Sequence, residues 1–148
     1  MIALIQRVTK GSVTKDEEVI SHIEKGYVIL LGIFEDDTEQ DVDKLINKIS
    51  NLRIMSDEND KLNLSIKDVN GKILLVSQFT LCADLSFGRR PSFIKAKKPE
   101  AARKLYELTI KKLINEGIDV QKGSFGQYMQ VEIINDGPVT IIVDSEKL

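Results

Sequence analysis

The order of hydrophobic and polar positions in the first third of the chain predicts three strands. Residues 2–9 are apolar with high β propensity, and residues 12–14 are candidates to extend the same strand. Residues 19–23 alternate between apolar and polar, which is typical of a half-buried strand. Residues 27–34 are almost continuously apolar, which indicates a strand buried on both faces. We interpret these segments as a three-stranded meander.

Two later segments have the spacing of amphipathic helices. In the first, Asp36, Asp37 and Thr38 are candidate N-caps, and apolar residues recur every three or four positions over about 38–52. The second begins at Pro99, because proline favours the first turn of a helix, and ends at Gly117. Each helix therefore has one apolar face to bury.

The middle of the chain predicts further strands and one long loop. The Asn70-Gly71 pair is the strongest hairpin signal in the sequence, and residues 72–81 form the strand after it. Residues 83–99 are irregular, and loops of this length are usually functional or disordered. Residues 129–133 alternate again. We predict one α+β domain over residues 1–148, with a mostly antiparallel, barrel-like sheet and two packed helices.

The last apolar run is interrupted by the polar segment Asn135–Thr140. Its Gly137-Pro138 pair does not suit a regular ladder, because proline lacks an N–H and glycine adopts backbone angles that other residues avoid. One interpretation is a turn that joins two strands, for which these residue types are a strong signal. The other is a rigid backbone edge that a ligand approaches closely.

Composition limits the class of protein. With 148 residues, 42% hydrophobic and 30% charged, the chain resembles an ordinary globular domain with a substantial core. No segment approaches the ~18 consecutive apolar residues of a membrane span, and the N-terminus lacks the pattern of a signal peptide. Its one cysteine, Cys82, forms no internal disulfide and fits a reducing compartment. We expect a cytoplasmic protein without a membrane partner.

The charge is unevenly distributed. The whole chain has a net charge of −2, yet the segment Arg89–Lys104 contains seven basic residues and one acidic residue. A phosphate backbone is one candidate partner, and Arg89, Arg90, Lys97 and Lys98 are its candidate contacts. A solvated loop and helix start explains the same charges. Because tryptophan is absent and only 5% of residues are aromatic, we do not expect a base-stacking platform.

Most side-chain constellations for catalysis are missing. His22 and Cys82 are the only residues of their types, so they cannot build a zinc site. A triad on Ser77 would need His22, which the alternation places on a strand surface. Cys82 is more typical of a small apolar filler, and the acidic loop at residues 57–60 lacks the spacing of a calcium loop. We expect no metal and no cofactor. An enzyme of this sequence would use backbone amides, hydroxyls and an amide side chain on a substrate that supplies its own reactive group.

Two motifs together carry a family resemblance. Ser77-Gln78-Phe79-Thr80-Leu81 and Asn135–Thr140 resemble the paired signature of the D-aminoacyl-tRNA deacylases of the bacterial and eukaryotic type. The likeness covers the full length, with further family positions at residues 1–8 including Arg7, 51–54, 88–93 and 126–131. Cys82 departs from the family, where an aromatic residue is common, but it only flanks the motif.

The resemblance implies a carboxylic ester hydrolase. Such enzymes cleave the ester between a D-amino acid and the terminal adenosine of tRNA, and they also remove glycine mischarged on alanine tRNA. The resemblance further implies homodimers with sites at the subunit interface. A cis glycine-proline pair from one subunit then reaches into the partner's pocket, where its carbonyls exclude any L side chain.

Transferred to this sequence, the resemblance assigns roles to individual residues. Gly137 and Pro138, flanked by Val139 and Thr140, would form the chiral filter, and Arg7 would hold it in place. The adenosine and ester pocket would be lined by Ser77, Gln78, Phe79 and Thr80, with Phe125 and Met129 as further wall. No base is available to activate Thr80, so the ribose 2′-hydroxyl of the substrate is the better candidate to help activate water.

Two rival interpretations remain. A non-catalytic RNA-binding module would use the basic segment Arg89–Lys104 and bind tRNA in a salt-sensitive way without hydrolysis. A structural or regulatory dimer would use Gly137-Pro138 only as a turn.

Overall fold

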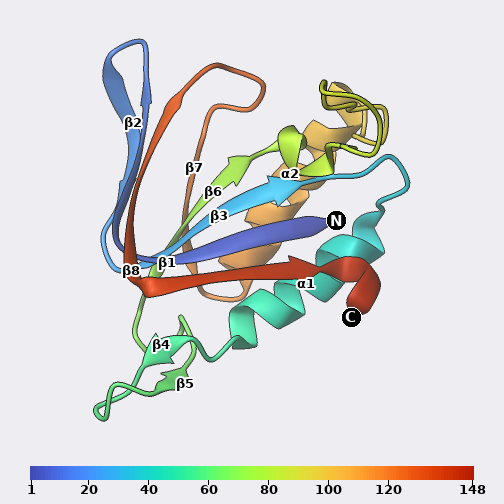
Figure 1. The fold of residues 1–148 in the computed structure, drawn as a ribbon. Helices are drawn as coiled ribbons and strands as arrows, with labels where there is room; N and C mark the ends of the chain where they lie inside the picture. The colour runs from blue at the N-terminus through green and yellow to red at the C-terminus, as the bar shows by residue number, and fades with distance from the viewer.

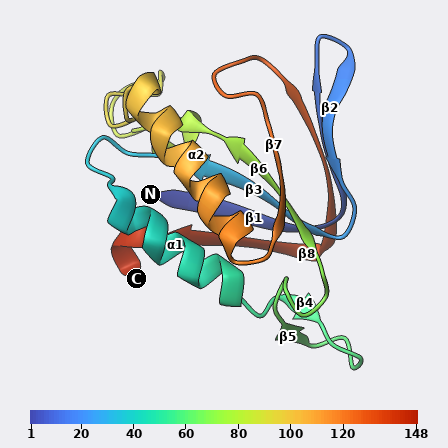
Figure 2. The same cartoon turned by 180° about the vertical axis from the view of Figure 1, so that it is seen from behind.

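The computed structural model describes all residues, 1–148, and its main feature is one strongly curved mixed sheet (Figure 1). The strands follow the order β2-β1-β3-β6-β7, and β8 pairs with the other edge of β1. Their bounds are Ile2–Lys15 for β1, Glu18–Ile23 for β2, Gly26–Gly32 for β3, Lys72–Ser77 for β6, Asp119–Lys122 for β7 and Gln130–Asp144 for β8. The two helices, α1 (Glu39–Asn51) and α2 (Pro99–Asn115), lie side by side against one face of the sheet (Figure 2).

Strand β1 organises the sheet. Strand β8 runs along one edge of it, while β3 pairs with its first half and β2 with its second half, all antiparallel. The curvature brings β2 near β7, where the Ser21 hydroxyl donates a hydrogen bond to the Lys122 carbonyl at 2.6 Å. The sheet is therefore nearly closed, which confirms the barrel-like α+β prediction. Strand β6 pairs in parallel with both β3 and β7, so the antiparallel pattern is not complete.

Apolar residues are buried on both faces of the central strands. The larger cluster lies between the sheet and the helices, and it includes Tyr27, Ile29 and Leu31 of β3 together with the apolar faces of α1 and α2. A smaller cluster on the opposite face includes Val28 of β3. Burial on both faces, predicted for residues 27–34, is thus confirmed. Neither helix combines the length and hydrophobicity that a transmembrane helix needs.

Local signals also explain the ends of the helices. Thr38 caps α1 in a reciprocal capping box with Asp41, and Pro99 is the first residue of α2. Beyond α2, Gly117 has a φ of +83°, which favours glycine at the end of a helix. Both predicted helices are confirmed to within one or two residues.

Three predictions about strands are wrong. The opening strands are not a meander, because β1 rather than β2 is central. Asn70-Gly71 does not form a β-hairpin: it belongs to a turn closed by a hydrogen bond from the Gly71 N–H to the Ile66 carbonyl, and β6 then pairs in parallel. The Asn-Gly signal fixes a local turn but not the partner of the next strand, which burial decided. Strand β6 also ends at Ser77, and a short 3₁₀ helix, η1 (Phe79–Cys82), follows.

A small two-stranded ribbon lies apart from the main sheet. It consists of β4 (Met55–Ser56) and β5 (Leu62–Leu64), which pair antiparallel after the end of α1. At the other end of the chain, η2 (Ser145–Lys147) follows β8 and lies beside Met1, whose carbonyl accepts a hydrogen bond from the Ser145 N–H at 2.9 Å. The two termini therefore lie close together (Figure 1).

Candidate active site

The segment Asn135–Thr140 is an enlarged bulge and not a chain reversal. Strand β8 pairs with β1 on both sides of it, with Asn135 opposite Val8 and Thr140 opposite Gln6. Residues 136–139 thus stand opposite Arg7 alone, and the chain continues in its original direction. The turn interpretation is therefore wrong about how the strands are joined. The Gly137–Pro138 peptide bond is cis, and both residues are exposed.

Arg7 anchors this bulge from inside the protein. Its Nε donates a hydrogen bond to the Asp136 carbonyl at 3.1 Å and lies 3.2 Å from the Asp136 carboxylate. On the other side, Nη1 donates to the Ile54 carbonyl at 3.0 Å and to the Ser56 hydroxyl at 3.1 Å. The guanidinium thus ties the bulge to the β4–β5 ribbon. Because Arg7 is only 8% exposed, these contacts are shielded from competition by water.

Asn135 and Gly137 fix the shape of the bulge. The side-chain amide of Asn135 donates to the carbonyls of Arg7 at 2.9 Å and Val139 at 3.0 Å, which closes the neck of the bulge. Gly137 has a φ of +131°, and a Cβ there would lie 2.8 Å from the Val139 Cγ2 and 3.1 Å from the Arg7 Nη2. Only glycine fits this position without a shift of its neighbours.

A cavity of about 670 Å³ opens at the end of β6. The structure brings several predicted site residues together there: Ser77, Gln78, Phe79, Phe125, Met129, Lys97 and Lys98. Thr80 lies on η1 next to them, but it is exposed and does not line the cavity; its hydroxyl accepts a hydrogen bond from the Gln78 amide. Arg89 and Arg90 are exposed on the neighbouring loop.

Other residues of the cavity were not predicted as site residues, although Phe93 and Tyr128 lie in segments that carry the family resemblance. Phe93 packs edge-on against Phe79, with ring centroids 5.0 Å apart, and lines the same cavity. Ala102 reaches it from α2, where its position in the apolar stripe looked purely structural. Tyr128 also lines the cavity and is 88% exposed. The Phe125 ring packs against the Tyr106 ring, with the two ring centroids 5.5 Å apart.

The cavity contains no side chain suited to act as an acid or a base by ordinary ionisation near neutral pH. Its lining includes no aspartate, glutamate, histidine or cysteine. His22 lies on β2, partly exposed, 3.1 Å from Glu24. Cys82 is buried, and this burial, with a smaller contribution from the Asp37 charge, raises the pKa of its thiol to about 11. A neutral buried thiol is a poor nucleophile. No group of three or more His, Cys, Asp or Glu residues is placed to hold a metal ion.

The bulge and the cavity lie apart within one chain. Arg7, opposite the bulge, pairs with Tyr27 at the start of β3, whereas Ser77 pairs with Leu31 near the end of β3. Four residues of strand separate these positions, which corresponds to roughly 13 Å along the sheet. In agreement, none of Arg7, Gly137 and Pro138 lines the cavity.

Comparison with known proteins agrees with the full-length resemblance. The family described as D-Tyr-tRNA(Tyr) deacylase matches residues 4–144. The chain is 52% identical over 147 residues to a D-aminoacyl-tRNA deacylase of Clostridioides difficile (strain 630), covering 99% of both chains. It is 53% identical over 148 residues to one of Sulfurihydrogenibium sp. (strain YO3AOP1), covering 100% of both. A solved structure named c-Myc DNA Unwinding Element Binding Protein is 41% identical, with a TM-score of 0.91 over 97% of this chain and 98% of that one. The chain therefore belongs to the D-Tyr-tRNA(Tyr) deacylase family.

Proposed function

We propose that this chain hydrolyses the ester bond of D-aminoacyl-tRNA, releasing the D-amino acid and tRNA, and that it works as a homodimer. Family membership over the full length supports the reaction. The observation that carries the stereochemical part is the exposed Gly137–Pro138 backbone, which Arg7 and Asn135 hold in one conformation. Such a fixed edge is suited to a role in which its shape decides what binds.

The separation of the two motifs supports the proposed homodimer. Gly137 and Pro138 do not line the cavity of their own chain that contains Ser77 and Gln78. A second copy would bring the bulge of one subunit to the cavity of the other. The outward position of the bulge on β8, a strand paired with β1 alone, supports this arrangement.

In the dimer, the carbonyls of Gly137 and Pro138 would occupy the space that an L side chain needs, with Val139 and Thr140 supporting them. A pocket that merely fits the D side chain discriminates by only ~1–3 kcal/mol for each methylene-sized group. A rigid backbone in the path of the wrong enantiomer adds repulsion, which discriminates better. Glycine has no side chain to reject, so glycyl-tRNA(Ala) is the expected second substrate.

The chemistry would depend on the substrate itself. Because no base lines the cavity, the ribose 2′-hydroxyl would help to activate the attacking water. The backbone N–H groups of Phe79 and Thr80 begin η1 and have no partner within that helix, so they are available to stabilise the oxyanion. The Thr80 side chain, exposed and bonded to Gln78, would not be the nucleophile.

Basic residues would hold the tRNA. Lys97 and Lys98 line the cavity, and Arg89 and Arg90 stand on the loop beside it. Reversing the charges of Lys97 and Lys98 should weaken tRNA binding without changing the preference for D over L esters. A changed preference would count against this assignment. The cytoplasmic location expected from the single cysteine stays a prediction.

Deacylation of D-tyrosyl-tRNA and L-tyrosyl-tRNA by the purified protein tests the proposed function. We expect rapid release of tyrosine from the D ester and very little from the L ester. Equal rates, or none, would defeat the proposal. A second candidate, nucleic-acid binding without hydrolysis, is favoured by the name of the similar solved structure and by the basic segment. It predicts salt-sensitive binding of tRNA with neither ester cleaved.

A further inference from the structure

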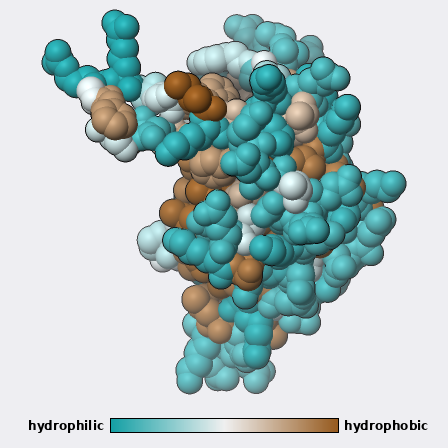
Figure 3. Space-filling model, turned by 90° about the vertical axis from the view of Figure 1, so that its right-hand side faces the viewer, coloured by the Kyte–Doolittle hydropathy of each residue, from teal (hydrophilic) through white to brown (hydrophobic).

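A fully exposed loop, residues 85–91, projects from the rim of the cavity (Figures 1 and 3). Its neck is closed by two backbone hydrogen bonds between Asp84 and Ser92, at 2.8 and 3.0 Å. Phe93, the residue after Ser92, packs against Phe79 in the cavity wall. The loop is therefore attached to the cavity rim. A ligand that extends out of the cavity beside Phe93 would lie next to this loop.

The loop combines aromatic, apolar and basic side chains. Phe87 is 85% exposed and forms no aromatic pair within the chain. Arg89 and Arg90, two and three residues further on, are exposed and form no ion pair. Figure 3 shows this mixture, with hydrophobic and hydrophilic side chains next to each other on the projecting segment. Nothing within the chain accounts for the exposed ring.

The other aromatic side chains near the rim point to the same kind of partner. Although the aromatic content is low, Phe79, Phe87 and Tyr128 are 57%, 85% and 88% exposed. Two of them, Phe79 and Tyr128, line the cavity, and Phe87 stands on the loop beyond it. An aromatic ring next to arginines is what proteins use to bind single-stranded nucleic acid, since bases stack on the ring and phosphates pair with the cations. The low aromatic content of the whole chain therefore does not describe this rim, where exposed rings gather.

We infer that the loop of residues 85–91 binds the unpaired nucleotides that precede the terminal adenosine of tRNA. This inference rests on the proposed function, which places that adenosine in the cavity. Phe87 stacks on a base, and Arg89 and Arg90 contact the adjoining phosphates. Tyr128, at the rim, is placed to stack on the nucleotide nearest the cavity.

Charge complementarity favours RNA over a second copy of the chain as the occupant. The loop contains two arginines and no acidic residue, and the segment Arg89–Lys104 to which it leads is strongly basic. Two such loops meeting across a symmetric contact would bring arginines against arginines, which is unfavourable. A polyanionic strand neutralises all of them.

The decisive variants are Phe87→Ala, Phe87→Tyr and, as a matched control, Ile114→Ala. Ile114 is also an exposed apolar residue, 52% exposed, but it lies on α2 away from the loop. Each variant is assayed on two esters, D-tyrosyl-tRNA and D-tyrosyl-adenosine, because the second lacks the preceding nucleotides. Loss of one stacked base should lower kcat/KM for the tRNA ester about tenfold in Phe87→Ala. The adenosine ester should be cleaved as by the wild type, and Phe87→Tyr should restore the tRNA activity.

Binding of uncharged tRNA provides a readout that does not depend on hydrolysis. We expect Phe87→Ala to bind about tenfold more weakly, and each of Arg89→Ala and Arg90→Ala to reduce the slope of log affinity against log salt by about 0.7. Equal losses on both esters, no loss at all, or a changed dimer mass for Phe87→Ala in light scattering would overturn the inference. If the wild type cleaves neither ester, the proposed function fails, while the tRNA-binding comparison still decides the inference about the loop.

Discussion

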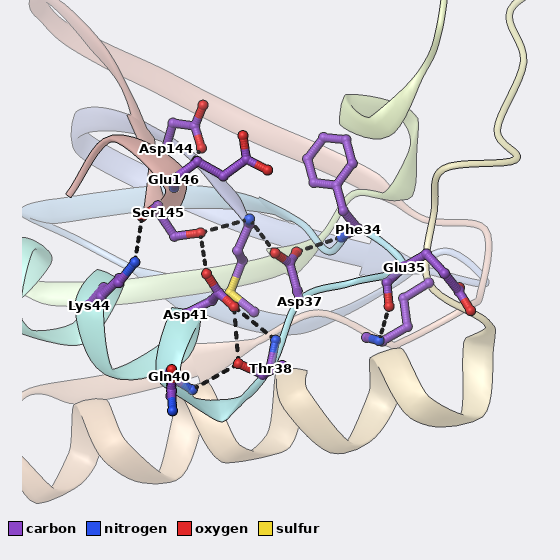
Figure 4. Close-up of polar contacts among 12 residues, drawn as sticks. Phe34, Glu35, Asp37, Thr38, Gln40, Asp41, Lys44, Asp144, Ser145 and Glu146 are labelled. Carbon is purple, nitrogen blue, oxygen red and sulfur yellow. Dashed lines mark hydrogen bonds and ion pairs between the residues drawn. The ribbon is translucent and has the colours of Figure 1, made fainter.

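Two positions along the β1–β8 pair each bury a positive charge, yet they do so in different ways: Met1 directly precedes β1, and Arg7 lies in the middle of it. At one end, the Met1 ammonium is completely buried, 2.6 Å from the Asp37 carboxylate and 2.8 Å from the Ser145 hydroxyl (Figure 4). Asp37 also accepts the Phe34 N–H at 2.6 Å, and Ser145 donates to Asp41 at 2.9 Å. Every partner in this cluster belongs to the interior or to the start of α1.

In the middle of the pair, the buried Arg7 guanidinium has partners that reach the surface. The Arg7 guanidinium is held mainly by the carbonyls of Asp136 and Ile54 and by the Ser56 hydroxyl, and its carboxylate partner, Asp136, is about half exposed. Beyond these groups, Gly137 and Pro138 are open to solvent. The groups around the Met1 ammonium bond to one another and position no exposed backbone, which suits a role in stability. The second positions exposed backbone, which suits recognition of a substrate.

The largest expected effect is on stability, from Asp37→Asn. This change leaves the buried Met1 ammonium without its counter-charge, which typically costs ~3–5 kcal/mol. Urea or guanidinium unfolding should show the loss, while the D-over-L preference of the protein that remains folded should be unchanged. Asp36→Asn is the matched control: Asp36 is exposed, so its change should stay within about 0.5 kcal/mol. A loss of stereoselectivity in Asp37→Asn would contradict the assignment of the Met1 cluster to stability and not to recognition.

Gly137→Ala should show the opposite pattern. An added Cβ meets Val139 and Arg7, and the positive φ is costly for alanine, so we expect a loss of about 1–3 kcal/mol and a displaced bulge. The displaced carbonyls should admit L-tyrosyl-tRNA and lower the ratio of D to L deacylation about tenfold. Gly117→Ala is the control, since Gly117 also has a positive φ but a Cβ there meets nothing within 4 Å. If both variants lower the ratio of D to L deacylation equally, backbone strain alone explains the result.

Ser56→Ala should have a smaller effect through Arg7. It removes one of the hydrogen bonds of the guanidinium, worth about 1 kcal/mol, while the bond to the Ile54 carbonyl remains. We expect a modest fall in the D-to-L ratio, about twofold, with little change in KM for the D ester. Rescue by Ser56→Thr, which keeps the hydroxyl, would assign the effect to this bond. An unchanged ratio would show that the ribbon does not help to position the bulge.

The smallest effect is expected from Thr80→Ala. Because the Thr80 hydroxyl is exposed and no base adjoins it, single-turnover deacylation of D-tyrosyl-tRNA should stay within about twofold of the wild type. Complete loss of activity with unchanged tRNA binding would assign the hydroxyl a direct part in the chemistry.

The sequence predicted the helices and strands better than it predicted which strands pair with each other. Periodicity and caps gave both helices and most strands, because these signals are local. Parallel pairing of β6 depends on burial between β3 and β7, which Asn70-Gly71 does not encode. The residue types of Asn135–Thr140 favour a turn as one interpretation; only the pairing with β1 on both sides shows that the chain does not reverse there.

The candidate site was predictable only where a motif marked it. Ser77, Gln78 and Phe79 lie together because one strand end carries them. Ala102 and Phe93 reach the same cavity from distant segments, and no spacing in the sequence announces this. The ion pair between Met1 and Asp37 likewise joins residues that are far apart in the chain, so it was not predicted.

The most direct test of the central claim is the ratio of D- to L-tyrosyl-tRNA deacylation in Arg7→Lys. Lysine keeps the charge but loses the planar fork that binds the Asp136 and Ile54 carbonyls at once. We predict that L-tyrosyl-tRNA becomes a substrate and that the ratio falls at least about tenfold, while the D ester is cleaved at close to the wild-type rate. A ratio equal to that of the wild type would contradict the claim that Arg7 holds a backbone wall against L substrates.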